Sequence, residues 1–283
     1  MHDAITRRAF LAGSAAAVAL AACSSGGTKK SDLTMVTFSD PSALRPAQPA
    51  RLTMGFADSQ GAILTQPPQP QLTFTVTSNG TPIGQPLSVP AHTEGIPKAY
   101  FPVVFTPPQP GIYTIATNAG GSTQTRDIQI TATTDVVGVG QMMIPFDTPT
   151  VSDPRGVELL CTRTPPCPLH DVTLREALAG GTPVAFLVAT PQFCQTAICG
   201  PVLDVLLAEK DRFPNIKMLH SEVYPTVAAA QPSVGQVVPV VDAYHLTFEP
   251  ALYLAKPDGT IANRIDTIFD GVELRAALTD LTR

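Results

Sequence analysis

The pattern of apolar and polar residues changes character about halfway along the chain. In the first half, short runs alternate between the two kinds, as in residues 71–77, which read QLTFTVT. Such alternation predicts strands with one buried and one exposed face. In the second half, residues 183–188 (PVAFLV) form a continuous apolar run between turn-forming residues, which predicts a strand buried on both faces. Residues 201–213 carry apolar side chains at helical spacing and predict a helix.

The first half contains several more short strands, separated by turns rich in proline and glycine. Beside residues 71–77, we expect strands at 100–105, 111–116 and 125–131. Ser78-Asn79-Gly80 is typical of a hairpin turn. About seven such strands between residues 51 and 133 predict an all-β immunoglobulin-like sandwich. His92 and Glu94 are close in sequence, but we expect them in a solvated loop rather than at a metal site.

Two cysteines lie between the buried strand and the following helix. Cys194 and Cys199 are five positions apart, which on one regular helix rotates the two side chains by about 140°. A disulfide between them therefore requires Cys194 to lie in the loop before the helix. Gly200-Pro201 favours this arrangement, and Pro201 suits the first helical position. The helix N-terminus then favours the thiolate form of a nearby cysteine.

A strand, a cysteine pair and a helix in this order resemble the opening of a thioredoxin-like redox domain. The rest of the C-terminal half agrees, with an expected strand at 216–223, a hairpin turn at 256–259 and a closing helix at 274–281. Pro250, before the apolar run at 251–254, resembles the cis-proline that faces the cysteines in this family. The resemblance covers about residues 157–283 and implies an α/β thioredoxin-like domain with Cys194, Cys199 and Pro250 as catalytic residues.

The cysteine spacing departs from the family pattern of two intervening residues. Four residues separate Cys194 from Cys199, as in peroxiredoxins of the Q type. Those enzymes place a threonine three residues before the first cysteine, and Pro191 stands there in this chain. The resemblance implies a thiol–disulfide oxidoreductase, with Cys194 attacking and Cys199 resolving. A thiol peroxidase and a non-catalytic binding or copper-handling lipoprotein that retains the fold are the alternatives.

The N-terminus has the features of an export signal. Residues 1–22 contain Arg7-Arg8, which resembles a twin-arginine motif, followed by an apolar stretch of about a dozen residues. The sequence before Cys23 resembles a lipoprotein cleavage box, which implies a lipid on Cys23. We therefore expect residues 23–50 to be a flexible tether and the protein to be anchored by lipid on the extracytoplasmic face of the cell membrane.

The remaining cysteines are expected to be structural. Cys161 and Cys167 lie in a short, proline-stiffened loop within the expected second domain, after a linker at residues 134–156. Four cysteines allow three pairings, and proximity favours 161–167 and 194–199. The 161–167 pair is predicted to be a structural clasp, and we expect neither a metal ion nor a cofactor.

The net charge limits the classes of partner, and four further polar residues are considered for a role near the cysteines or at a metal site. A formal charge of −5 without an extended basic run argues against nucleic acid as a partner. The expected partner is an exported protein or a small thiol or disulfide. Acids often lie beneath cysteines in such domains, so Asp204 and Glu222 are candidates, although a solvated or capping position is favoured for each. His220 is expected to be a core residue and His245 to lie in a surface loop.

Overall fold

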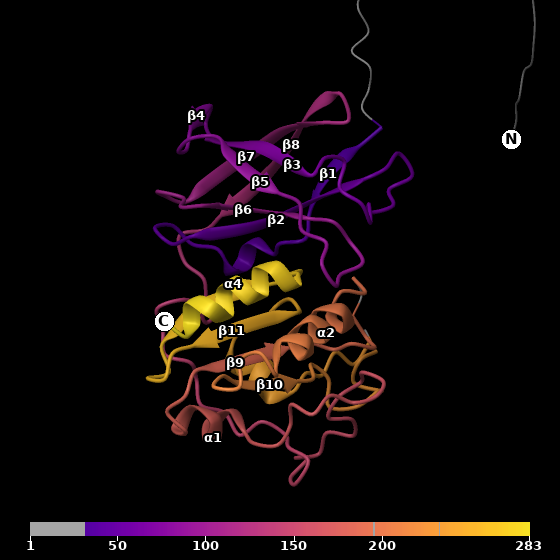
Figure 1. Cartoon of the computed structure of the whole chain (residues 1–283), viewed down its shortest axis with the longest axis vertical. Helices are drawn as coiled ribbons and strands as arrows, with labels where there is room; N and C mark the ends of the chain where they lie inside the picture. Colours follow the sequence, from indigo (N-terminus) through magenta and orange to yellow (C-terminus); the bar gives the residue numbers. More distant parts are fainter. Residues whose placement is uncertain (1–31, 195, 232) are drawn as a thin grey trace, which may run out of the picture. The chain divides into compact units, whose positions relative to one another are not determined.

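The described chain is built mainly from β-strands in three sheets, with a few short helices around the third sheet (Figure 1). This computed structural model describes residues 32–194, 196–231 and 233–283. The predicted signal peptide, Cys23 and the first part of the predicted tether lie outside the described residues. No helix among the described residues is long and apolar enough to cross a membrane.

Two antiparallel sheets make up the first half and share one apolar core. One sheet has the order β1-β2-β6, and the other has the order β4-β3-β7-β8 with β5 paired to β3. Their strands are β1 (Thr34–Thr37), β2 (Ala50–Ala57), β3 (Gln71–Ser78), β4 (Thr81–Pro82), β5 (Leu87–Pro90), β6 (Phe101–Phe105), β7 (Gly111–Ala119) and β8 (Ser122–Ile130).

The alternation in β3 has the predicted effect. Leu72, Phe74 and Val76 point into the core shared with the other sheet, and the residues between them are exposed. β3 and β4 form a hairpin through Asn79 and Gly80, both of which have positive φ. The predicted hairpin is therefore confirmed. Asparagine and glycine suit this turn because they adopt a positive φ at the lowest energetic cost.

The predicted tether is too long at its C-terminal end. β1 lies within residues 23–50, pairs with β2 and buries Met35, which is 2% exposed. The 3₁₀ helix η1 (Pro41–Ala43) follows, and Asp40 caps it by accepting a hydrogen bond of 2.7 Å from the Ser42 amide. The chain is therefore already folded from Thr34 onward.

The third sheet forms the centre of the second half. Its order is β10-β9-β11-β12, with β9 and β10 parallel and the other pairs antiparallel. Its strands are β9 (Val184–Val188), β10 (Lys217–Ser221), β11 (Ala251–Ala255) and β12 (Ile261–Asp266). Every residue of β9 is buried, as the continuous apolar run predicted.

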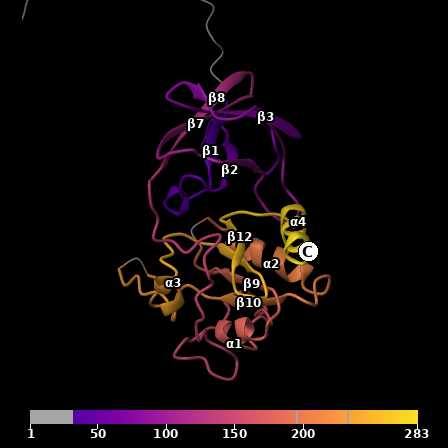
Figure 2. The same cartoon turned by 90° about the vertical axis from the view of Figure 1, so that its left-hand side faces the viewer.

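Helices cover both faces of this sheet. The helices are α1 (Leu174–Ala179), α2 (Cys199–Glu209), α3 (Pro239–Ala243) and α4 (Gly271–Leu281). Side chains of α2 and α4 join one core cluster with Leu187 and Leu254, whereas those of α1 and α3 join another with Phe186 and Tyr253. Figures 1 and 2 both show α2 and α4 side by side. Alternate residues of the central strands therefore contribute to two separate apolar cores, one on each face of the sheet.

The ends of the helices follow local sequence signals. Thr173 caps α1 and forms a capping box with Glu176. α2 begins two residues before the predicted position, at Cys199, so Pro201 lies within the first turn rather than at its first residue. A proline is tolerated there because the first amides of a helix have no partner within it.

A partly buried polar contact joins β2 to the start of α4. The Arg51 guanidinium donates two hydrogen bonds to the Glu273 carboxylate, of 2.5 and 2.6 Å, and further ones to the carbonyls of Asp266 and Ile268. His92 is not solvated as expected, because its Nδ1 lies 2.8 Å from Asp270 and its side chain is 11% exposed. Residues 32–283 accordingly belong to one compact unit.

Candidate active site

Cys194 and Cys199 form a disulfide at the junction of β9 and α2. Their Cα atoms are 6.0 Å apart, which is an ordinary separation for a disulfide. Cys194 lies in the turn that follows β9, and Cys199 is the first residue of α2. The geometric requirement drawn from the spacing, that Cys194 must precede the helix, is confirmed.

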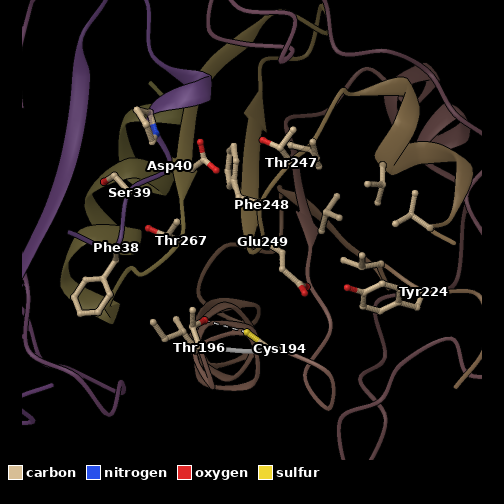
Figure 3. A pocket seen from close by; sticks show the side chains of 17 residues that line it. Phe38, Ser39, Asp40, Cys194, Thr196, Tyr224, Thr247, Phe248, Glu249 and Thr267 are labelled. Atoms are coloured by element: carbon tan, nitrogen blue, oxygen red, sulfur yellow. Dashed lines mark hydrogen bonds between the residues drawn. The ribbon is translucent and has the colours of Figure 1, made fainter. Parts of the chain in front are cut away.

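The two sulfur atoms differ in access to solvent. Cys199 is fully buried, whereas Cys194 is half-buried. The amide of Cys199 donates a hydrogen bond of 3.4 Å to the sulfur of Cys194, and the Thr196 hydroxyl lies 3.2 Å from the same sulfur (Figure 3). These two donors and the helix N-terminus stabilise negative charge on Cys194 once the disulfide is reduced.

A partly buried acid lies next to the inner cysteine. Pro250 follows a cis peptide bond, and the residue before it, Glu249, places its Oε2 3.6 Å from the sulfur of Cys199. The same oxygen accepts a hydrogen bond of 2.8 Å from the Thr190 amide. This carboxyl is the titratable group that the structure brings against the disulfide from the side of the sheet.

The surroundings of Glu249 bring the pKa of its carboxyl close to neutral pH. Burial raises the pKa of its carboxyl to about 7, the Thr190 hydrogen bond opposes that rise, and the nearby Glu222 adds to it. A carboxyl with this pKa is both an effective proton donor and an effective proton acceptor near neutrality.

Asp204 and Glu222, rather than Glu249, were the sequence-based candidates for an acid beneath the cysteines. Asp204 is an exposed residue that pairs with Arg163 at 2.6 Å, as the solvated alternative predicted. Glu222 is buried and accepts hydrogen bonds of 2.6 and 2.8 Å from the amide and hydroxyl of Thr162. Glu249 was missed, although it stands immediately before the proline that the family resemblance singled out.

The disulfide opens onto a pocket of about 490 Å³. Cys194, Glu249, Phe248 and Tyr224 line it from the second half of the chain. Figure 3 shows the Glu249 side chain extending to the side of the pocket where Cys194 and Tyr224 lie. Part of the opposite wall comes from the segment between β1 and η1, which includes Phe38 and Asp40. The first half of the chain therefore shapes the surroundings of the disulfide.

The expected 161–167 disulfide is not formed in the structure, where both cysteines are free and buried. They lie together with His220, which is 2% exposed, and with His170, which sequence reasoning did not consider. His245 is exposed in the turn after α3, as expected.

Comparison of the chain with models of known protein families gave no match, and a search of curated proteins gave none either.

Proposed function

We propose that this protein is a thiol–disulfide oxidoreductase, held by lipid on the extracytoplasmic face of the membrane, with Cys194 and Cys199 as its redox pair. Its catalytic part is a thioredoxin-like domain that follows an immunoglobulin-like sandwich. The observation that carries the proposal is the arrangement of one half-buried cysteine on a pocket, one buried cysteine behind it, and the Glu249 carboxyl 3.6 Å from the buried sulfur. Cis-Pro250 beside this site supports the kinship.

The reaction begins when a substrate thiolate attacks the sulfur of Cys194. The Cys194–Cys199 bond breaks, a mixed disulfide forms at Cys194, and the electron pair leaves with Cys199, which takes a proton from Glu249. A second substrate thiolate then attacks the substrate sulfur of the mixed disulfide. The products are an oxidised substrate and a reduced protein. Both steps run in reverse when the reduced protein meets a substrate disulfide.

The difference in exposure assigns the two roles. An incoming sulfur can approach Cys194 from the pocket, whereas Cys199 is completely covered. The aromatic side chains of Phe248 and Tyr224 flank the approach and suit an apolar segment of an exported protein. A small thiol also fits within the pocket volume of about 490 Å³.

The test is to trap the mixed disulfide. With Cys199→Ser, the Cys194 thiolate attacks a substrate disulfide such as oxidised glutathione, and one half of the substrate leaves as a thiolate. The mixed disulfide at Cys194 has no resolving partner, so a covalent adduct should accumulate and appear in the intact mass of the protein. Cys194→Ser is the matched control and should form no adduct, because Cys199, Cys161 and Cys167 are all buried. An adduct on Cys199 in the Cys194→Ser variant would reverse the assignment of the attacking and resolving cysteines.

A second measurement separates catalysis from a structural crosslink. Equilibration with glutathione or dithiothreitol gives the reduction potential of the pair, and a labile pair should lie above about −300 mV. A pair that can be reduced only on unfolding would refute the proposal and leave a binding protein. Rapid consumption of hydrogen peroxide with sulfenic acid on Cys194 would instead identify a thiol peroxidase.

A further inference from the structure

Four potential metal ligands meet in the interior of the second half, away from the proposed redox pair. Cys161, Cys167, His170 and His220 each offer one atom, and these four atoms all lie within 4.8 Å of one another. All four residues are at most 6% exposed. Three of them come from one short loop, and His220 comes from β10.

The distances within this cluster have the size expected for ligands around one small ion. The sulfur of Cys167 lies 3.2 Å from Nε2 of His170 and 3.5 Å from Nδ1 of His220, and these two nitrogens are 3.3 Å apart. A tetrahedral zinc site has metal–sulfur bonds of about 2.3 Å and metal–nitrogen bonds of about 2.0–2.1 Å, so neighbouring ligand atoms lie about 3.3–3.8 Å apart. The cluster therefore needs little rearrangement to hold an ion at its centre.

Contacts outside the cluster orient its members. The Nε2 of His220 lies 2.9 Å from the carbonyl of Ala189 and must donate to it, so its Nδ1 carries the lone pair that faces the sulfurs. The Cys167 amide donates a hydrogen bond of 3.4 Å to the sulfur of Cys161. Metal-binding histidines usually donate their second ring N–H to a group such as a backbone carbonyl, and outer hydrogen bonds of this kind orient the ligands.

We propose that Cys161, Cys167, His170 and His220 bind one Zn²⁺ ion as a closed structural site. Two sulfurs and two imidazole nitrogens in a tetrahedral arrangement are a donor set that selects zinc. Four protein ligands leave no open position for water or substrate, so the ion stabilises the fold instead of taking part in a reaction. Binding releases the two thiol protons to solvent, and the charge of the ion balances the two thiolates.

The ion would attach the 161–170 loop to the sheet next to the redox pair. Thr162, which follows Cys161, donates its hydroxyl to Glu222 and accepts a hydrogen bond of 3.0 Å from the Gln192 amide. Gln192 is two residues before Cys194. The zinc site thus lies behind the turn that carries the outer cysteine, although the proposal does not depend on the redox function.

The first experiment measures the metal content of the full chain, purified without chelators from cells grown with zinc. We expect one zinc per chain by elemental analysis, and a tetrahedral thiolate–cobalt spectrum after exchange with Co²⁺. His220→Gln should reduce the zinc content from one equivalent to none. His245→Gln, which removes an exposed histidine, is the matched control and should retain the full equivalent.

A second measurement does not depend on a variant that folds. The wild-type protein is unfolded in the presence of a chelator and an alkylating reagent but without reductant, and its peptides are analysed by mass. Alkylated Cys161 and Cys167, together with an intact 194–199 disulfide, support the zinc site. A 161–167 disulfide, no bound metal, or stoichiometric copper in place of zinc would overturn the proposal.

Discussion

Replacing Glu249 with glutamine should stabilise the protein above neutral pH while it slows thiol exchange. Glutamine has the same shape and keeps an oxygen that can accept the hydrogen bond from the Thr190 amide. It removes only the charge that Glu249 carries when it is ionised inside the protein. The substitution therefore isolates the cost of burying that charge next to Cys199.

The magnitude follows from the raised pKa. Burial lifts the pKa of Glu249 from an ordinary value of 4.5 to about 7. Each pKa unit corresponds to about 1.4 kcal/mol, so the ionised carboxylate costs the folded state about 3 kcal/mol above that pH. Since Thr190 donates to both the carboxylate and the amide, we expect about 1–3 kcal/mol of this to appear as a gain for Glu249→Gln.

The sign depends on pH in a defined way. Below about pH 4.5 the carboxyl is protonated in both states, and the substitution should have little effect. Between about pH 4.5 and 7 the folded protein binds the proton and the unfolded chain does not, so wild-type stability falls as pH rises. The advantage of the variant should therefore grow through this window and be complete by about pH 8.

Urea unfolding of the oxidised full chain, followed by circular dichroism at about pH 4 and pH 8, measures the effect. Glu158→Gln removes an exposed glutamate and is the control, with an expected change below about 0.5 kcal/mol at both pH values. An equal change for Glu249→Gln at the two pH values would show that burial of its charge is not what sets its pKa.

Three further outcomes test other parts of the structure. Cys23→Ala should release the protein from membranes, and a variant that still sediments with them at high salt would contradict the lipid anchor. Arg51→Met removes two hydrogen bonds from the partly buried carboxylate of Glu273 and should cost about 1–3 kcal/mol of unfolding free energy, measured with urea. After reduction, an alkylating reagent near neutral pH should label Cys194 before Cys199, as peptide mass analysis would reveal; the opposite order would contradict the role of exposure.

Much of the architecture was predictable because local patterns decide it. The alternation in β3 and the fully apolar run of β9 each predicted the element that the structure contains. β1 was missed because a strand of four residues is too short to show a period, and it gains its stability by pairing with β2.

The site was predictable only where its residues are neighbours in sequence. The spacing of Cys194 and Cys199 was enough to place Cys194 before the helix, whereas the helix itself begins at Cys199, two residues earlier than predicted. Glu249 is 50 positions from Cys199 and reaches it only because β11 lies beside β9. No local pattern reports such a contact.

The free cysteines illustrate the same limit. Proximity alone suggested that Cys161 and Cys167 bond to each other, since six positions separate them. The alternative depends on His220, which lies 53 positions after Cys167 and joins the cluster because its amide donates a hydrogen bond of 3.2 Å to the Leu169 carbonyl of the 161–170 loop. A histidine in a predicted strand gives no sign of which side chains the sheet will bring to it.

The contact between Arg51 and Glu273 also bears on how the protein is made. These residues are 222 positions apart, so a ribosome that adds about 5–20 residues per second delivers Glu273 roughly 10–45 s after Arg51. During that interval the nascent chain carries a cation whose partner does not yet exist. The ion pair between Arg51 and Glu273 can form only after α4 has been translated. The contact between Arg51 and Glu273 is therefore present only in chains that have been translated at least as far as Glu273.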